Sequence, residues 1–319
     1  MKKSLLLMAF IMLSLVTQAQ QTPQFTQYIF NGIHINPGYA GYKGVPYFQS
    51  TYRRQWVNLP GAPRTLSVSA DVSANEGTMG FGLSILADQA GPTSTTTGSL
   101  SYAYRVQVGR ESFIGLGVSA GMAQYVLDGS KLNPADMDDP DIPQGRQQVI
   151  APDMSLGIFF HNERYYAGLS AFNLIGQSTI ANQNISLSFH NYHYYFTAGG
   201  LFDMGYSVKF KPSFLIREET AGPTNYDINA MFLFNERLWL GTSFRSNVKF
   251  NKENLQNALN NRNSIAILIE VFATEDFRIG YAFDYNTNAL QGLNNNSHEI
   301  SLGYYINPKY KRMRNPRWF

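Results

Sequence analysis

Residues 276–285 read DFRIGYAFDY, and this stretch decides the fold class. Large apolar side chains stand at every second position from Phe277 to Tyr285, whereas the positions between them carry Arg278, Asp284 and two small residues. Successive side chains of a β-strand point to opposite faces, so the apolar side chains share one face. This pattern is typical of a wall strand in an outer-membrane barrel, whose apolar face meets lipid and whose polar face meets the lumen.

The same alternation recurs in segments of roughly ten residues over most of the chain. In a bilayer every backbone N–H and C=O must be paired within the protein, so such strands must close into a barrel. An even number of strands is usual in these barrels. We count fourteen segments, near residues 47–57, 64–73, 79–87, 95–107, 111–126, 153–161, 164–173, 187–202, 206–217, 225–234, 237–246, 264–273, 276–285 and 298–307.

The connections between these segments alternate between short and long. The short ones are residues 74–78, 108–110, 162–163, 203–205, 235–236 and 274–275. The long ones include residues 127–152, 174–186, 246–263 and 286–297. Outer-membrane barrels have short periplasmic turns and longer extracellular loops, so we expect the first strand to start, and the last to end, in the periplasm. The sequence therefore predicts an all-β transmembrane antiparallel barrel of about fourteen strands.

The first residues predict export. Lys2 and Lys3 precede an apolar run over residues 5–16, and Thr17-Gln18-Ala19 offers the small residues of a cleavage site. A membrane-spanning helix needs roughly 20 apolar residues, and no later segment reaches that length. Because the chain has no cysteine, we expect neither disulfides nor a cysteine-linked lipid. Without the two lysines the formal charge of +3 falls to about +1, which excludes nucleic acid as a partner of the whole chain.

Charged residues of both signs fall on the lumen face of the predicted strands. They indicate a hydrated or salt-bridged lumen rather than an apolar tunnel. The set comprises Arg105, Lys209, Lys211, Arg245, Glu270, Arg278 and Asp284.

Patterns typical of catalysis or metal binding are weak. Residues 117–121 match the G-x-S-x-G motif of hydrolases, but they lie inside a strand, so we interpret them as a stripe of small residues on the wall. His190 and His193 are three positions apart on a strand and point to opposite faces. The aspartates of residues 136–141 could hold Ca²⁺, but the glycine and glutamate spacing of a calcium loop is missing, which favours a solvated loop. We expect no enzymatic activity, no cofactor and no metal.

The segment before the first strand does not alternate, and its motifs are distinctive. It reads QFTQYIFN over residues 24–31 and INPGYAG over residues 35–41, followed by RRQWV at 53–57 and GAPRT at 61–65. Asn-Pro-Gly predicts a turn, and a proline at the edge of a hairpin needs no ladder donor. The residues that we single out as candidate partner contacts are Asn36, Pro37, Tyr39, Ala40, Gly41, Arg54, Gln55, Trp56, Gly61, Ala62 and Pro63.

The last residues are strongly basic. This tail is either a solvated end or a contact with an anionic surface or a periplasmic protein. Its positive residues are Lys309, Lys311, Arg312, Arg314 and Arg317.

These motifs resemble the N-terminal signature of the PorP/SprF family of the type IX secretion system of Bacteroidetes. The chain has Thr26 where that pattern has Ser and Gly38 where it has Ala, and its ending RNPRWF also resembles the usual ending of the family. The resemblance implies an outer-membrane barrel that works with the type IX machinery. Some members are associated with its periplasmic lipoprotein ring, and others pair with individual large secreted adhesins.

The expected organisation has four parts. Residues 1–19 form a signal peptide, 20–45 a periplasmic segment or plug, 46–307 the barrel and 308–319 a basic periplasmic tail. The expected function is secretion or surface attachment of large cargo proteins by protein–protein interaction. The expected partners are outer-membrane lipids and either the lipoprotein ring or an adhesin. The alternative function is a fourteen-stranded channel for small or hydrophobic solutes.

Overall fold

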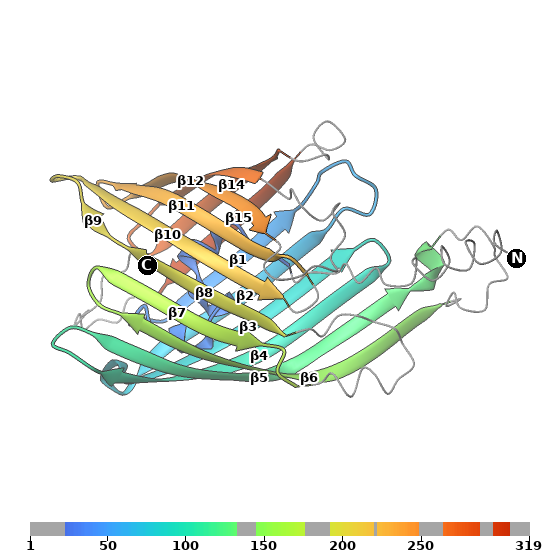
Figure 1. The fold of residues 1–319 in the computed structure, drawn as a ribbon, viewed down its shortest axis with the longest axis horizontal. Helices are drawn as coiled ribbons and strands as arrows, with labels where there is room; N and C mark the ends of the chain where they lie inside the picture. The colour runs from blue at the N-terminus through green and yellow to red at the C-terminus, as the bar shows by residue number, and fades with distance from the viewer. Residues whose placement is uncertain are drawn as a thin grey trace, which may run out of the picture.

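The computed structural model describes residues 23–132, 145–175, 192–219, 222–248, 264–287 and 296–306. They form one antiparallel sheet in which each wall strand pairs with its neighbours in the chain (Figure 1). The first strand, β1 (Tyr47–Arg54), pairs with the last, β15 (Ser297–Tyr305), and so closes the barrel. The other strands are β2 (Arg64–Ala74), β3 (Met79–Ala90), β4 (Thr93–Gln107), β5 (Phe113–Asp128), β6 (Arg146–His161), β7 (Tyr165–Phe172), β8 (His193–Gly200), β9 (Phe202–Asp203), β10 (Val208–Glu219), β11 (Thr224–Phe234), β12 (Leu238–Val248), β13 (Ser264–Phe272) and β14 (Phe277–Asn286).

The fifteen labelled strands make fourteen wall strands, because β8 and β9 are two pieces of one strand. Both pieces pair with β10 in the same register, with Gly199 opposite Ser213 and Asp203 opposite Lys209. The interruption faces Pro212, which has no N–H to donate to the ladder. The predicted count of fourteen is therefore confirmed. The predicted start of this strand, residues 187–191, lies outside the described residues.

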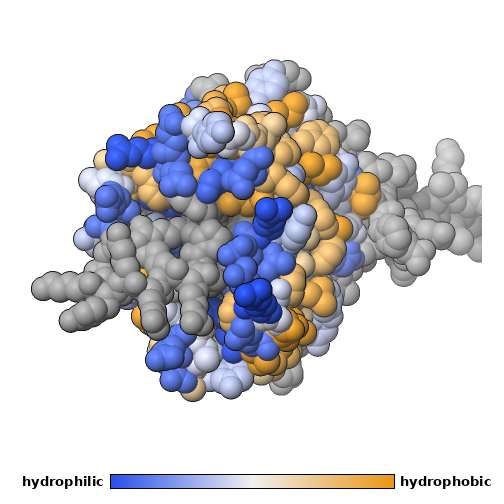
Figure 2. Space-filling model, turned by 90° about the vertical axis from the view of Figure 1, so that its left-hand side faces the viewer, coloured by the Kyte–Doolittle hydropathy of each residue, from blue (hydrophilic) through white to orange (hydrophobic). Residues whose placement is uncertain are grey.

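The predicted alternation of faces is also confirmed. On β2, Leu66 and Val68 are 45% and 44% exposed, whereas Ser67 between them is buried. Figure 2 looks onto one end of the barrel and shows hydrophilic residues gathered there, with hydrophobic residues around the side wall. An apolar outer wall of this kind suits contact with lipid. Among the described residues, no helix is long and apolar enough to cross a membrane.

The two ends of the barrel differ. The connections at the short-turn end, such as η4 (Asn75–Gly77) between β2 and β3, contain only a few residues. At the other, long-loop end, β6 continues past β7, and η5 (Gly129–Lys131) follows β5 (Figure 1). Since periplasmic turns are the short ones in such barrels, the long-loop end faces the cell exterior.

Residues 23–46, the lumen segment, run inside the barrel as three short 3-10 helices. These are η1 (Gln27–Phe30), η2 (Gly32–His34) and η3 (Pro37–Tyr39). The segment starts near the long-loop end, where Thr26 bonds to Arg53, and reaches the short-turn end, where Lys43 lies over the ring of Tyr47. Strand parity places the start of β1 at the short-turn end, but it does not determine the path of the residues before it.

Candidate functional site: the lumen segment and the vestibule above it

The lumen segment fills the barrel because its apolar side chains have inward-facing partners. Phe30 packs against Trp239, with ring centroids 6.2 Å apart. Burial of one such large side chain contributes roughly 1.5–3 kcal/mol, so the whole set binds the segment firmly. The buried cluster comprises Phe25, Tyr28, Ile29, Phe30, Ile33, Tyr39, Ala40 and Tyr42 of the segment with, among wall residues, Phe159, Leu215, Met231, Trp239 and Leu268.

Basic residues bind the carbonyl groups of the segment. Short 3-10 helices leave several backbone groups without a partner inside the helix, and these must be paired when buried. Three of the four donors come from lumen charges that the sequence identifies, and the fourth is Lys43 of the segment itself. The bonds are Arg245 to the Phe25 oxygen at 3.1 Å, Lys211 to the Ile29 oxygen at 3.0 Å, Lys43 to the Phe30 oxygen at 3.0 Å and Arg105 to the Ala40 oxygen at 3.1 Å.

Acidic residues bind the N–H groups of the segment. Glu299 accepts hydrogen bonds from the backbone N–H of Thr26 and of Gln27, each at 2.8 Å. Asp71 accepts one from the N–H of Gly41 at 3.0 Å. The acidic and basic groups thus hold the segment along its full length.

Ion pairs balance these buried charges. Arg53 lies between Asp284 and Glu299, and its bond to Glu299 is 2.9 Å long. Elsewhere in the lumen Arg217 and Arg245 share Asp227, and Arg278 pairs with Glu270. Lys209 meets the exposed Glu236 near a short turn. The predicted salt-bridged lumen is confirmed, and its charges bind the segment as well as one another.

A group of glycines forms the seat of the Asn36-Pro37-Gly38 turn. The Asn36 side chain accepts a bond from the Gly38 N–H at 2.8 Å and donates one to the Ile158 oxygen at 2.9 Å. A Cβ at Gly117 would lie 2.1 Å from the Gly38 nitrogen, and one at Gly157 would lie 2.1 Å from the Asn36 Oδ1. The G-x-S-x-G match therefore lies on the wall, as interpreted, and its first glycine makes room for the turn.

Most signature residues before β1 are enclosed by the barrel. Asn36, Tyr39 and Ala40 are 2%, 3% and 0% exposed, and Pro37 is buried beside them. Gly41 has a φ of +68° and touches Gly80, where a side chain would not fit. A partner could contact these residues only after the segment had left the lumen.

The signature residues after β1 lie at the long-loop end. Arg54 ends β1 with an exposed side chain, and Gln55 and Trp56 line the cavity described below. Gly61, Ala62 and Pro63 form the loop before β2, where the Gly61 φ of +73° requires glycine and Pro63 also lines the cavity. The basic tail and the acidic residues 136–141 lie outside the described residues.

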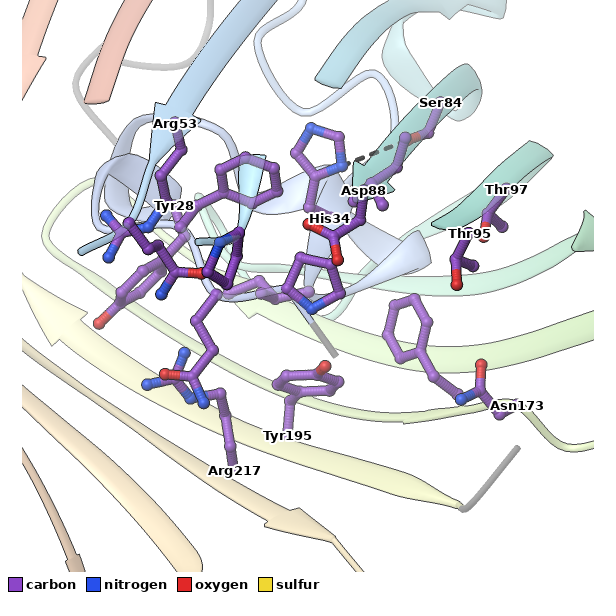
Figure 3. Close-up of a pocket in the computed structure, with 18 of the residues that line it drawn as sticks. Tyr28, His34, Arg53, Ser84, Asp88, Thr95, Thr97, Asn173, Tyr195 and Arg217 are labelled. Atoms are coloured by element: carbon purple, nitrogen blue, oxygen red, sulfur yellow. Dashed lines mark hydrogen bonds between the residues drawn. The ribbon is translucent and has the colours of Figure 1, made fainter. Parts of the chain in front are cut away.

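A cavity of about 550 Å³, the vestibule, lies above the lumen segment at the long-loop end (Figure 3). Phe25, Ile33, His34 and Pro37 form its floor. Inward hydroxyls and residues near the rim complete it, among them Ser84, Asp88, Thr95, Thr97, Ser101, Ser119, Asn173, Tyr195 and Arg217. Beneath, the pocket between the segment and the wall near Asn36 holds only about 20 Å³. A space of this size holds about one water molecule, so this pocket is too small for a larger solute.

His34 shows how tightly the floor is packed. Its ring nitrogens lie 2.8 Å from the Ser67 Oγ and 3.1 Å from the Ser84 Oγ, the second of which is drawn in Figure 3. Sequence patterns single out neither His34 nor Glu299, because each residue gains its partner only when the segment enters the barrel.

The comparisons with known proteins concern both the whole chain and its fold. The family model "Type IX secretion system membrane protein PorP/SprF" matches residues 17–304. No curated protein matches the chain. The toluene transporter TbuX of Ralstonia pickettii is 8% identical, with 88% of this chain and 93% of that chain covered and a TM-score of 0.52. A FadL homologue of Pseudomonas aeruginosa is 11% identical, with coverages of 89% and 94% and a TM-score of 0.48. At 8% identity the likeness to TbuX shows a common barrel fold alone.

Proposed function

Because the chain belongs to the PorP/SprF family of type IX secretion system membrane proteins, we propose that its barrel holds a segment of a large secreted protein at the outer face of the outer membrane. The observation that carries the proposal is a lumen with two unlike parts. The lumen segment fills the lumen at the short-turn end and reaches the long-loop end beside Arg53, and the vestibule of about 550 Å³ lies above it at the long-loop end. The barrel is thus filled at its periplasmic end and has a cavity at its exterior end.

The vestibule has the size and chemistry to take several residues of a polypeptide. Ligand sites of roughly 300–1,000 Å³ are usual, and they combine apolar surface with a few polar groups. Here Phe25, Ile33 and Leu86 supply apolar surface, and hydroxyl groups such as that of Thr97 supply donors and acceptors. Arg217 and Asp88 add charges of both signs on opposite sides.

The alternative function, a channel for small or hydrophobic solutes, has less support. A solute would have to displace the lumen segment and break the bonds that Arg105 and Lys211 donate to it and the bonds that Glu299 accepts from it. Such bonds to charged groups contribute about 1.5–3 kcal/mol each. The barrier to opening is therefore high.

The test fills the vestibule without disturbing the barrel. Thr97 points into the cavity from β4, so Thr97→Trp should occupy it and release large type IX cargo from the cell surface into the medium. Leu100 lies on the same strand but points outward and is 67% exposed, so Leu100→Trp is the matched control. The proposal would be refuted if the cargo stayed on cells that carry Thr97→Trp and also on cells that lack the protein altogether.

A further inference from the structure

Among the described residues, no strand pairs with one edge of the first half of β6. β6 pairs with β5 over all of its length, from Arg146 to His161. On its other side it pairs with β7 only from Leu156 onward, and one further bond joins the Leu174 N–H to the Met154 oxygen at 3.0 Å. Within the described part of the chain, the edge from Arg146 to Pro152 has no strand beside it.

The backbone groups on that edge can be assigned. In an antiparallel ladder alternate residues direct both their N–H and their C=O to the same side. Since the Met154 oxygen faces β7, the groups of Gln148, Ile150 and Pro152 face the free edge. Gln148 and Ile150 each offer a donor and an acceptor, and Pro152 offers an acceptor alone.

The free edge projects above the bilayer. A spanning strand needs roughly 9–11 residues, and nine residues counted from His161 end at Asp153. The remainder of β6 therefore stands in the exterior aqueous phase, beside the vestibule. Asp153 on β6 and Tyr125 on β5 line the vestibule, so the inner face of this hairpin continues its wall.

We propose that the free edge of β6, at Gln148, Ile150 and Pro152, is a docking edge on which an extended segment of the secreted protein adds a strand. The inference rests on the proposed function, because the segment is one that continues out of the vestibule. Addition of a strand to an exposed edge gives affinity through main-chain hydrogen bonds, with side-chain pockets giving specificity. The vestibule supplies the pockets, and the edge supplies the backbone groups.

Pro152 is compatible with an added strand. Proline occurs in sheets at edge strands, where its missing N–H would face outward. In the same barrel β10 contains Pro212, and the ladder between β10 and the strand formed by β8 and β9 keeps its register across that residue. An added strand can cross Pro152 in the same way.

Photo-crosslinking in intact cells tests where the secreted protein lies. A photoreactive amino acid at Gln148 should crosslink to a surface protein of the type IX class. The matched control is Met122, which lies opposite Pro152 on β5, is 53% exposed and belongs to a strand paired on both sides. Crosslinks of equal yield from both positions, or from neither, would overturn the docking edge.

Two substitutions at Ile150 distinguish the contribution of its backbone N–H to docking from that of its side chain. Ile150→Pro removes the edge N–H, whereas Ile150→Ala keeps it and removes the apolar side chain. We expect Ile150→Pro to lower retention of the secreted protein about tenfold and Ile150→Ala to lower it much less. A heat-dependent shift in gel mobility checks that both barrels are folded, and the Gln148 crosslinks give an answer even where Ile150→Pro does not fold.

The outcomes distinguish the edge from the proposed function. If Thr97→Trp releases the cargo while Ile150→Pro retains it and Gln148 gives no crosslink, the docking edge is wrong and the proposed function stands. A second variant replaces residues 176–191 by a linker of equal length. If Gln148 crosslinks to cargo in this variant but not in the parent, the chain's own residues occupy the edge in the parent, and the inference is overturned. Loss of cargo crosslinks in Ile150→Pro, with the linker variant unchanged from the parent, supports it.

Discussion

Glu299 offers the sharpest test of how the lumen segment is held. Its carboxylate is 0% exposed and accepts the backbone N–H groups of Thr26 and Gln27, both at 2.8 Å. It also pairs with Arg53, but Arg53 belongs to the wall, and that pair persists when the segment leaves. Only the two bonds to the segment therefore count toward the free energy of its release.

The expected effect of Glu299→Gln follows from these two bonds. Hydrogen bonds to a charged group contribute about 1.5–3 kcal/mol each, and those between neutral groups about 1 kcal/mol. The amide of glutamine has one acceptor oxygen, so it keeps one bond at neutral strength and loses the other. The loss is about 3 kcal/mol, which raises the population of the released segment by roughly 150-fold.

The assay uses a chain that contains no native cysteine. Ile29 is 5% exposed in the buried cluster, so a cysteine in the variant Ile29→Cys reacts with a membrane-impermeant maleimide only after the segment is released. When release and return are fast relative to labelling, the labelling rate follows the released population. Glu299→Gln should then raise that rate by roughly 150-fold.

The control is an acidic residue whose ion pair is exposed. Glu236 pairs with Lys209 at 3.2 Å and keeps 64% of its side-chain surface exposed, so Glu236→Gln should leave the rate unchanged. A labelling rate in Glu299→Gln within about threefold of the parent would refute the reasoning, because a difference that small corresponds to less than about 1 kcal/mol.

Two further predictions concern the lumen segment. Gly117→Ala should raise labelling at least tenfold or impair barrel folding, because its Cβ would lie 2.1 Å from the Gly38 nitrogen, whereas Gly98→Ala meets open space and should change neither. Deletion of residues 24–43 should give ion conductance in planar bilayers where the intact protein gives none, and a silent deletion variant with a folded barrel would contradict the view that the segment closes the lumen.

The sequence by itself determined the barrel. Alternation is a local property, because successive side chains of a strand point to opposite faces whatever the rest of the chain does. The alternation of Leu66, Ser67 and Val68 therefore predicted which side chains face lipid and which face the lumen. The alternating lengths of the connections predicted the fourteen strands and which end of the barrel faces the periplasm. The motifs around Asn36 and Trp56 identified the family. Even the interruption opposite Pro212 follows from a residue without an N–H.

Only the tertiary structure decided what the lumen contains. Thr26 and Glu299 are separated by 273 positions, and no local pattern joins a 3-10 turn to a wall strand across that distance. The lumen charges were visible in the sequence, but their partners include backbone groups of a segment whose path strand parity does not determine. The edge of β6 that has no partner strand among the described residues also appeared only in the structure, because it depends on where the neighbouring strand β7 ends. Long-range pairing in three dimensions, rather than local periodicity, decides which polar groups are satisfied and which remain available to a partner.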